Sequence, residues 1–166
     1  MERHCCLPTG IKENPTIEME NQNRDPKHFI AFDLGATSGR TILGTLQNGN
    51  LTLKELTRFP NAVFRQGERF YWNIFSLYER LREGLQAAAK EGIDIVSVGI
   101  DTWGVDFVAV GHDGSLLGLP RAYRDPHTEG IPEAYFSEVL SKEKVYEATG
   151  IQIMNLNTLY QLYALR

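Results

Sequence analysis

The sequence predicts an α/β domain with a mixed sheet, in the order β-β-β-α-β with flanking helices. Three observations support this prediction: β-rich runs joined by short turns fill residues 29–59, apolar residues recur at helical spacing over residues 74–88, and a continuous β-branched run follows at residues 93–100. Short turns predict an antiparallel meander for the first three strands. A further strand reached through a helix then places the chain in the α/β class.

The meander has three expected strands. The first, at residues 29–32, ends at Asp33 and leads into a glycine-rich turn, and the next two occupy residues 40–46 and 51–59. An Asn-Gly pair at residues 48–49 is a strong hairpin-turn pattern between them. We expect residues 60–72 to form a loop.

The helix and the later elements follow from periodicity and end signals. Asn73 is a suitable N-cap and Gly92 a suitable stop for the helix. The apolar continuity of residues 93–100 predicts a central strand covered on both faces. The expected remainder is a strand at residues 107–110, a turn at 112–114, and helices near 132–140, near 143–148 and from about 157 to Arg166.

Composition excludes several classes of protein. The 166 residues are 42% hydrophobic and 23% charged, with a formal net charge of -4, which excludes collagen, low-complexity disorder and a disulfide scaffold. The acidic balance gives no reason to expect nucleic acid or a membrane as a partner, and no apolar run approaches the roughly 20 residues of a membrane span. We therefore expect a cytoplasmic protein. Only seven of the first 27 residues are hydrophobic, so residues 1–27 are predicted to be a disordered leader, with Met19 as an alternative start.

The first candidate site is the turn after the first strand. Gly35 and Gly39 permit close approach of a phosphate to the backbone, while Thr37 and Ser38 add hydroxyl donors. Asp33 can hold Mg²⁺ beside nucleotide phosphates. The alternative is a plain glycine-containing hairpin in which the aspartate stabilises the turn.

The second candidate site lies where the buried strand is expected to end, because ligands bind at the carboxyl ends of strands in open α/β sheets. Asp101 and Asp106 can accept hydrogen bonds from hydroxyl groups, Trp103 offers a face that stacks on sugars, and Gly104 leaves room for a ligand. In the alternative interpretation the tryptophan is a core residue and the aspartates cap turns.

A third cluster lies at residues 120–128. Tyr123 can supply another stacking face, whereas Arg124 and Asp125 are expected to form an ion pair that fixes the loop. Such surface pairs are usually structural. The stripe of Tyr160 and Tyr163, with Leu159 and Leu162, is predicted to be the core face of the last helix.

Together these motifs resemble the FGGY carbohydrate kinases, in particular the members that act on L-rhamnulose. The resemblance runs from about residue 29 to residue 165 and is carried by Asp-Leu-Gly-Ala-Thr-Ser-Gly-Arg at residues 33–40, Asp-Thr-Trp-Gly-Val-Asp at residues 101–106, Tyr-Arg-Asp at residues 123–125 and Asn-Thr-Leu-Tyr-Gln-Leu at residues 157–162. It implies a ribonuclease-H-like domain of the actin and hexokinase type. It also implies ATP and Mg²⁺ as cofactors and transfer of the γ-phosphate to L-rhamnulose, giving L-rhamnulose 1-phosphate.

The resemblance also implies roles for individual residues. Residues from Ala36 to Arg40 face the ATP phosphates, Gly104 contacts the sugar, and Trp103 and Tyr123 line its pocket. His127 stands where relatives commonly have arginine, and no role is assigned to it.

The catalytic general base is not found among these motifs. No aspartate of the chain matches the general base of the family, so this aspartate is expected beyond Arg166. Residues 28–166 are accordingly expected to be an incomplete N-terminal domain that is inactive alone. The alternatives are a kinase for xylulose, fuculose or glycerol, or a non-catalytic module that binds sugar or nucleotide.

Overall fold

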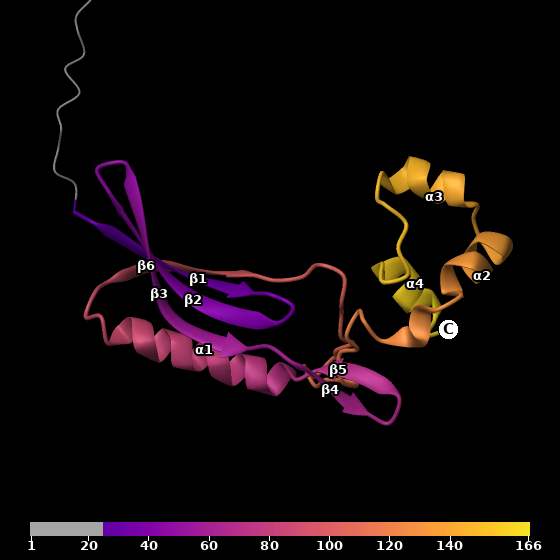
Figure 1. Ribbon diagram of the computed structural model, residues 1–166, viewed down its shortest axis with the longest axis horizontal. Helices are drawn as coiled ribbons and strands as arrows, with labels where there is room; N and C mark the ends of the chain where they lie inside the picture. Colours follow the sequence, from indigo (N-terminus) through magenta and orange to yellow (C-terminus); the bar gives the residue numbers. More distant parts are fainter. Residues whose placement is uncertain (1–24) are drawn as a thin grey trace, which may run out of the picture.

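The computed structural model describes residues 25–166, so most of the predicted leader lies outside the described residues. A four-stranded sheet with one long helix against it forms one end of the molecule, and three short helices gather at the other end (Figure 1). The helices and strands are β1 Lys27–Leu34, β2 Ser38–Gln47, β3 Asn50–Pro60, β4 Val63–Gln66, β5 Arg69–Trp72, α1 Ile74–Ala89, β6 Ile95–Asp101, α2 Ile131–Glu138, α3 Lys142–Thr149 and α4 Thr158–Tyr163.

The sheet has the order β3-β2-β1-β6 and is mixed, as the sequence predicts. β1, β2 and β3 form an antiparallel meander, and β6 pairs with β1 in the parallel direction. Asn48 and Gly49, with φ of 51° and 80°, make the turn between β2 and β3. Two consecutive positive φ values are typical of the type I′ turns that suit twisted hairpins.

Helix α1 covers one face of this sheet. Asn73 caps it by accepting a hydrogen bond from the backbone N–H of Ser76. The core between helix and sheet is made of Ile30, Phe32, Leu43 and Ala88. Gly84 lies at the closest approach, where an added Cβ would stand 2.6 Å from the Phe32 ring. The absence of a side chain at this position therefore lets the helix lie directly on the strands.

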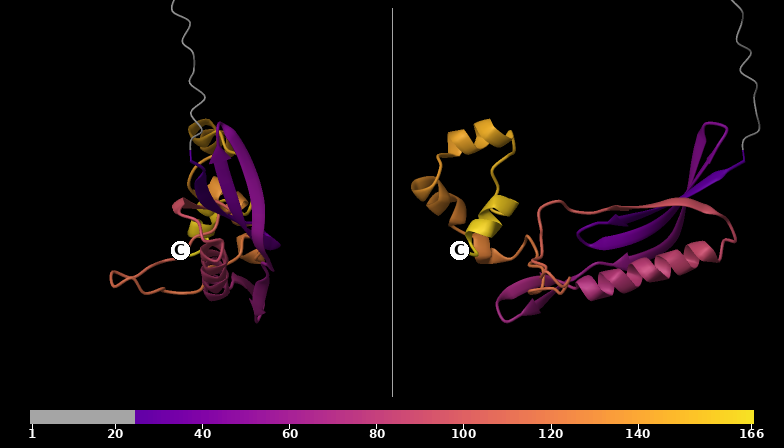
Figure 2. Two further views of the ribbon diagram at one scale, coloured as in Figure 1. Left: turned by 90° about the vertical axis from the view of Figure 1, so that its left-hand side faces the viewer. Right: turned by 180° about the vertical axis from the view of Figure 1, so that it is seen from behind.

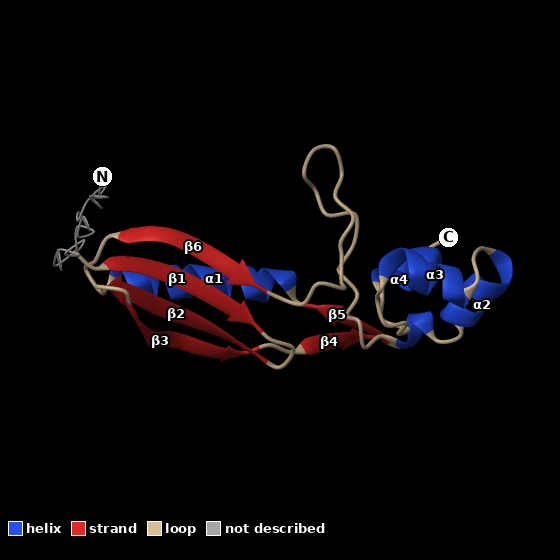
Figure 3. Cartoon of the chain, turned by 90° about the horizontal axis from the view of Figure 1, so that it is seen from above, coloured by secondary structure: helices blue, strands red, loops and turns tan. Residues whose placement is uncertain are grey.

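Strand β6 is not a central strand, contrary to the expectation from its apolar run. It forms one edge of the sheet (Figure 3), and no strand among residues 25–166 pairs with its outer side. Three of its four β-branched residues, Val96, Val98 and Ile100, are 60%, 50% and 58% exposed, and only Ile95 is partly buried. A continuous apolar run shows that a strand is suited to burial on both faces. The strand is buried only where other elements of the structure cover it.

Two other segments differ from their expected structure. Residues 60–72, expected to be a loop, form the β4–β5 hairpin, whose two-residue turn has Gly67 at φ 62°. Residues 107–110 form no strand, because only Val110 makes an isolated bridge, to Leu116. This segment instead leads into a loop that protrudes from the molecule (Figure 3).

The last helix is shorter than expected. α4 ends at Tyr163 and does not continue to Arg166. The Arg166 side chain instead lies over the Tyr163 ring, with its guanidinium carbon 4.5 Å from the centroid, and its Nη2 forms an ion pair with Glu138 Oε2 at 3.2 Å. Arg166 therefore links the end of α4 to the end of α2, a structural contact that the sequence did not predict.

The short helices α2, α3 and α4 lie beyond the hairpin, away from the sheet (Figure 2). Aromatic rings hold α2 against α4: Tyr135 meets Tyr160 and Tyr163 edge to face, with ring centroids 5.8 Å and 5.2 Å apart. Tyr160 is 1% exposed, which confirms its predicted core position, whereas Leu159 and Leu162 of the same stripe are 37% and 52% exposed and are not core residues. Among the described residues, no helix is long and apolar enough to span a membrane.

Candidate functional site

Two aspartates lie on neighbouring strands at the end of the sheet where candidate ligands are expected. Asp33 near the end of β1 is the register partner of Asp101 at the end of β6, in the parallel pair. Phe32 points into the core beneath α1, so Asp33 and its partner lie on the opposite face of the sheet, since side chains alternate along a strand. Arg40, the partner of Asp33 on β2, forms an ion pair with it.

The glycine-rich turn after β1 is closed by its own backbone and by a residue that sequence reasoning missed. The Gly35 N–H donates to the Ser38 carbonyl at 3.0 Å. Asn61 follows β3 and is 6% exposed; its backbone N–H donates to the Thr37 carbonyl at 2.9 Å, and its side-chain amide donates to the Gly35 carbonyl at 2.8 Å. No sequence pattern marked Asn61, because its partners come from a turn 26 residues earlier.

Two backbone donors of this turn remain open. Within residues 25–166, the N–H groups of Ala36 and Thr37 make no hydrogen bond. Thr37 is exposed. A turn whose carbonyls are bound by Asn61 while two of its N–H groups lack a protein partner keeps donors that a backbone anion site requires.

The glycines of the turn also have packing reasons. An added Cβ at Gly39 would stand 2.2 Å from the Phe59 ring, and one at Gly35 would stand 3.0 Å from the Ser38 carbonyl oxygen. The hairpin alternative therefore explains both glycines without a phosphate. The open donors of Ala36 and Thr37, not the glycines, are the feature of this turn that favours an anion.

Asp106 is the centre of a hydrogen-bond network rather than a free acceptor. Its Oδ2 accepts from Trp72 Nε1 at 2.5 Å and from the Tyr123 backbone N–H at 3.2 Å. Its Oδ1 accepts from Gln161 Nε2 at 3.2 Å. The carboxylate thus joins β5, the segment around residue 123 and α4, which come from three separate parts of the sequence.

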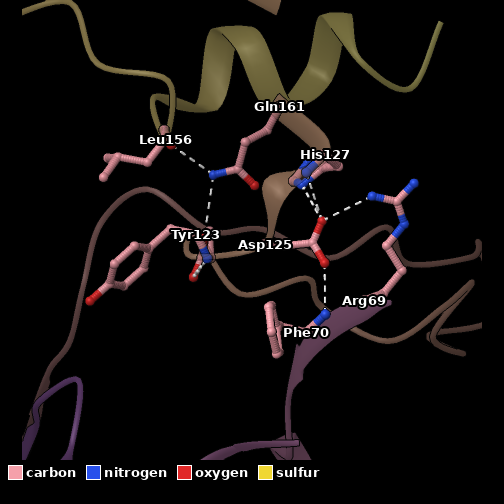
Figure 4. A network of polar contacts seen from close by, with 8 residues as sticks. Arg69, Phe70, Tyr123, Asp125, His127, Leu156 and Gln161 are labelled. Atoms are coloured by element: carbon pink, nitrogen blue, oxygen red, sulfur yellow. Dashed lines mark hydrogen bonds and ion pairs between the residues drawn. The ribbon is translucent and has the colours of Figure 1, made fainter. Parts of the chain in front are cut away.

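Trp72 and Gln161 were not identified from the sequence. Trp72 falls in the segment expected to be a loop, and Gln161 falls within a stripe interpreted as helix core. Gln161 is 2% exposed, and its Nε2 also lies 3.1 Å from the Val105 carbonyl oxygen and 2.8 Å from that of Leu156 (Figure 4). A buried amide with several carbonyl partners is a sign of fixed loop geometry.

An aromatic cluster surrounds Asp106. The Trp72 and Trp103 rings lie 4.1 Å apart at 32°, and the Trp72 and Tyr123 rings lie 6.0 Å apart. Trp72, Trp103 and Asp106 share a cavity of about 190 Å³. Gly104 lines a different cavity, of about 260 Å³, together with Tyr160. The structure therefore brings Trp103 and Asp106 together and leaves Gly104 facing another space.

The expected ion pair between Arg124 and Asp125 does not form. Arg124 instead lies over the Tyr123 ring, with its guanidinium carbon 5.5 Å from the centroid. Asp125 is 3% exposed and lies 3.4 Å from Arg69 Nη1 (Figure 4). It also accepts hydrogen bonds from the backbone N–H groups of Phe70 at 2.6 Å and of His127 at 2.9 Å. A buried carboxylate satisfied by backbone donors replaces the surface pair, because the β4–β5 hairpin brings those donors to it.

These contacts change two pKa values. Burial acts to raise the pKa of Asp125, but the backbone donors of Phe70 and His127 and the charge of Arg69 outweigh it and hold this pKa below the ordinary value of 3.8. Burial, with the positive charge of Arg121, lowers the pKa of His127 below 6.5, against the opposing charge of Asp125. His127 Nδ1 lies 2.9 Å from Asp125 Oδ1, but the alignment does not make a hydrogen bond.

Few side chains of the described residues are available to bind a divalent metal ion. Among the described residues, no group of three or more histidine, cysteine, aspartate or glutamate side chains is arranged to hold an ion. Asp33 and Asp101 present carboxylate oxygens, which Mg²⁺ prefers, and Mg²⁺ usually takes one or two carboxylates with water and substrate phosphates. The residues present therefore fit a Mg²⁺ ion that arrives with a nucleotide.

Comparison with known proteins places nearly the whole described segment in one family. The profile of the FGGY family of carbohydrate kinases, N-terminal domain, matches residues 28–166. A rhamnulokinase from Bacteroides thetaiotaomicron is 56% identical over 140 residues, and one from Oceanobacillus iheyensis is 44% identical over 137 residues. These matches cover 84% and 82% of this chain but 29% of each relative. The chain therefore spans less than a third of the length of these relatives.

Solved structures agree on the fold. A gluconate kinase and a xylulose kinase, both from Lactobacillus acidophilus, superpose with a TM-score of 0.69 and 17% sequence identity. They cover 85% and 84% of this chain and are themselves covered to 28%. The likeness supports the α/β fold of the actin and hexokinase type that the sequence predicts.

Proposed function

The chain belongs to the FGGY family of carbohydrate kinases, and from this premise we propose that it is the N-terminal part of an enzyme that phosphorylates L-rhamnulose. The reaction transfers the γ-phosphate of ATP to a sugar hydroxyl and gives L-rhamnulose 1-phosphate and ADP. The observation that carries the proposal is the 56% identity to a rhamnulokinase over 140 residues, a span that includes the glycine-rich turn and the tryptophan segment. The sites are assigned on the same basis.

The turn after β1 is assigned to the ATP phosphates. Its residues Gly35, Ala36, Thr37, Ser38, Gly39 and Arg40 surround the two open backbone donors. Phosphoryl transfer depends on positioning and on neutralisation of phosphate charge rather than on covalent chemistry. Arg40 supplies a cation there, and Asp33 would hold Mg²⁺, which supplies further neutralisation of that charge.

The sugar is assigned to the segment that follows β6. Asp101 is exposed and is available to accept hydrogen bonds from hydroxyl groups, while Trp103 and Tyr123 offer ring faces. Gly104 is assigned to the sugar on the resemblance alone, because it lines a different cavity from Trp103. Asp106 acts by positioning, because its oxygens already accept three hydrogen bonds from protein donors. Buried groups matched to the hydroxyls of one ketose discriminate against its epimers, whose hydroxyls would leave those groups unpaired.

Residues 28–166 form part of the N-terminal domain in this proposal. The general-base aspartate, expected beyond Arg166, and the adenine pocket would come from the part of the relatives that this chain does not match. We accordingly expect no kinase turnover from these 166 residues alone. ATP, Mg²⁺ and the sugar are the expected ligands, and the cytoplasm is the expected location.

The test uses two proteins. One is the 166-residue chain, and the other is the same chain joined after Arg166, as one polypeptide, to the remaining part of the Bacteroides thetaiotaomicron relative (the joined protein). With ATP and Mg²⁺, ADP release is measured for L-rhamnulose, xylulose, fuculose and glycerol. We expect activity from the joined protein, highest with L-rhamnulose, and none from the chain alone. A preference for another sugar, or turnover by the chain alone, would contradict the proposal.

A further inference from the structure

A cavity of about 310 Å³ lies at the base of the protruding loop. Both limbs of the loop line it, with residues 107–109 and 117–119, and Tyr71 of β5 and Leu165 after α4 complete the apolar part of its wall. None of the residues assigned above to ATP or to the sugar lines it. Sites for small molecules are mainly apolar, contain a few polar groups and have volumes of about 300–1,000 Å³, so this cavity has the size and the walls of such a site.

Arg121 brings an unpaired positive charge to the cavity. Its backbone forms an isolated bridge with Tyr71 of β5, which fixes the residue on the wall. Within residues 25–166 its guanidinium forms no ion pair and no hydrogen bond, and none of the residues that line the cavity is acidic. A guanidinium presents its N–H donors in a planar fork that matches a carboxylate, so an anion is the partner that this wall lacks.

His127 is the second polar group of the wall. Its side chain is 5% exposed, and its Nδ1 is buried without a hydrogen bond. Burial and then the charge of Arg121 lower the pKa of this imidazole, and the second effect requires the two groups to lie close together. The negative charge of Asp125 is offset by Arg69 and by two backbone donors, and Asp125 does not line the cavity. The polar part of the wall is therefore suited to a negative ligand.

Gln161 connects the cavity to the segments assigned to the sugar. It lines the cavity from α4, and its Nε2 donates to Asp106 Oδ1 at 3.2 Å. The other oxygen of Asp106 accepts from the Trp72 indole and from the Tyr123 backbone. A ligand that contacts Gln161 is thus one hydrogen bond away from the carboxylate that positions Tyr123.

We propose that this cavity binds a small organic monocarboxylate with an apolar body, in which Arg121 pairs with the carboxylate and the two limbs of the loop pack against the rest. A phosphate fits less well, because the wall offers one guanidinium in apolar surroundings, where a further unbalanced charge is costly. We expect the bound carboxylate to hold Gln161 in place and so to favour sugar binding. Binding to the cavity is independent of the proposed function, whereas the effect on the sugar rests on it.

The first experiment measures binding to the 166-residue chain by isothermal titration calorimetry at neutral pH. The probes are hexanoate, hexanol, acetate and inorganic phosphate. We expect hexanoate to bind at least about tenfold more tightly than each of the others, because hexanoate alone combines the charge with an apolar body. Equal affinity for hexanol would exclude a role for the charge, and equal affinity for acetate or phosphate would exclude a role for the apolar walls. Either result, or no binding of hexanoate, would overturn the proposal.

The second experiment uses a matched pair of variants. Arg121→Gln removes the charge from the wall, whereas Arg124→Gln removes a charge that lies over the Tyr123 ring and does not line the cavity. Both variants should fold, because neither guanidinium makes a hydrogen bond or an ion pair within residues 25–166, and circular dichroism verifies this. We expect R121Q to weaken hexanoate binding at least about tenfold and R124Q to change it less than about twofold. Equal losses would place the ligand elsewhere.

Nuclear magnetic resonance of the unmodified chain locates the ligand without any variant. Hexanoate should shift the imidazole signals of His127 along the same saturation curve that calorimetry gives. The imidazole signals of His28, whose Nδ1 lies 3.0 Å from Thr45 Oγ1 in the sheet, should stay in place. Binding that leaves His127 unshifted would overturn the assignment of the cavity, even if R121Q fails to fold.

The joined protein separates this site from the reaction. Saturating hexanoate should lower the KM for L-rhamnulose at least about twofold, and this effect should be absent in R121Q. An unchanged or raised KM would refute the link through Gln161. If hexanoate binds at Arg121 and His127 but no sugar is phosphorylated, the cavity assignment stands and the proposed function fails.

Discussion

Trp72 and Asp106 are joined by a hydrogen bond from the indole Nε1 to the carboxylate Oδ2, and this contact fastens the end of β5 to the segment that leaves β6. The two residues are 34 positions apart in the sequence. The Trp72 side of this contact is buried, with the residue 2% exposed. A hydrogen bond from a buried donor to a charged carboxylate contributes more to the stability of the fold than a hydrogen bond between two neutral groups.

The Trp72→Phe variant tests this contact, because it keeps an aromatic ring and removes the N–H donor. We expect a loss of about 1.5–3 kcal/mol in the free energy of unfolding, measured by urea denaturation of the 166-residue chain. Trp103→Phe is the matched control, since no hydrogen bond of the Trp103 indole is found among the described residues and its loss should be smaller. Equal losses would mean that ring volume, not the donor, matters at position 72.

Packing against Phe59 explains the glycine at position 39, so the stability lost on replacing Gly39 should depend on the size of the side chain at position 59. Gly39→Ala is expected to destabilise the chain by about 1–3 kcal/mol through overpacking, because the new Cβ would lie 2.2 Å from the Phe59 ring. The same substitution in a Phe59→Leu background should cost clearly less. A double-mutant cycle on urea midpoints measures this coupling; additive losses would refute the packing explanation.

The Asp125 carboxylate gives the chain a specific acid sensitivity. Its folded-state pKa lies below 3.8, so the unfolded state binds the proton more readily. The stability that this group contributes is therefore full at neutral pH and is lost as the pH falls below about 4 and through the folded-state pKa. We expect Asp125→Asn to lower stability at pH 7 and to flatten the fall in the unfolding free energy at acid pH. A variant with the wild-type slope would exclude Asp125 as its source.

Asp33 is expected to matter for turnover rather than for folding. In the joined protein, Asp33→Ala should lower kcat about a hundredfold or more while leaving KM for the sugar nearly unchanged, because it removes a group that acts on phosphate charge. Thermal unfolding should change little, since Asp33 and Arg40 form a partly exposed ion pair. Unchanged kcat/KM would remove Asp33 from the proposed metal role.

Local sequence patterns predicted the parts of this fold that depend on local chemistry. The Asn48-Gly49 turn, the Asn73 cap and the helical period of α1 each act within a few residues, and all were found where expected. The β4–β5 hairpin was missed because its strands have only four residues each. The exposure of β6 was missed because burial depends on which elements are present beside a strand, and no sequence window contains that information.

The residues of the candidate site also fall into two groups, those predicted from local sequence and those that depend on distant partners. Asp33 and Asp101 were identified from their places at strand ends, and the parallel register put them side by side. Asn61, Trp72 and Gln161 were missed because each works through partners far along the chain, which one sequence does not specify. The same cause explains Asp125, whose partner was sought in the adjacent Arg124 but is supplied by the hairpin.

Gly84 offers a test of the contact between helix and sheet. An added Cβ would stand 2.3 Å from Thr41 Oγ1 and 2.6 Å from Phe32. Gly84→Ala should therefore destabilise the chain by about 1–3 kcal/mol, although alanine is the better helix former by about 1 kcal/mol. Gly99→Ala is the control, because no atom lies within 4 Å of its added Cβ, and it should have little effect on the thermal midpoint. A stabilised G84A would contradict the close contact.

The close contact at Gly84 also determines which parts of the chain can move relative to one another. A helix seated against strands without an intervening side chain cannot roll or slide without a clash, so α1 and the sheet should behave as one rigid body. Any closing motion over a bound ligand must then take place elsewhere. Within the described residues, this rigid body is connected to the hairpin after β3 and at Asn73, between β5 and α1, and to the short helices by the segment that leaves β6. The hinge should be sought at these connections.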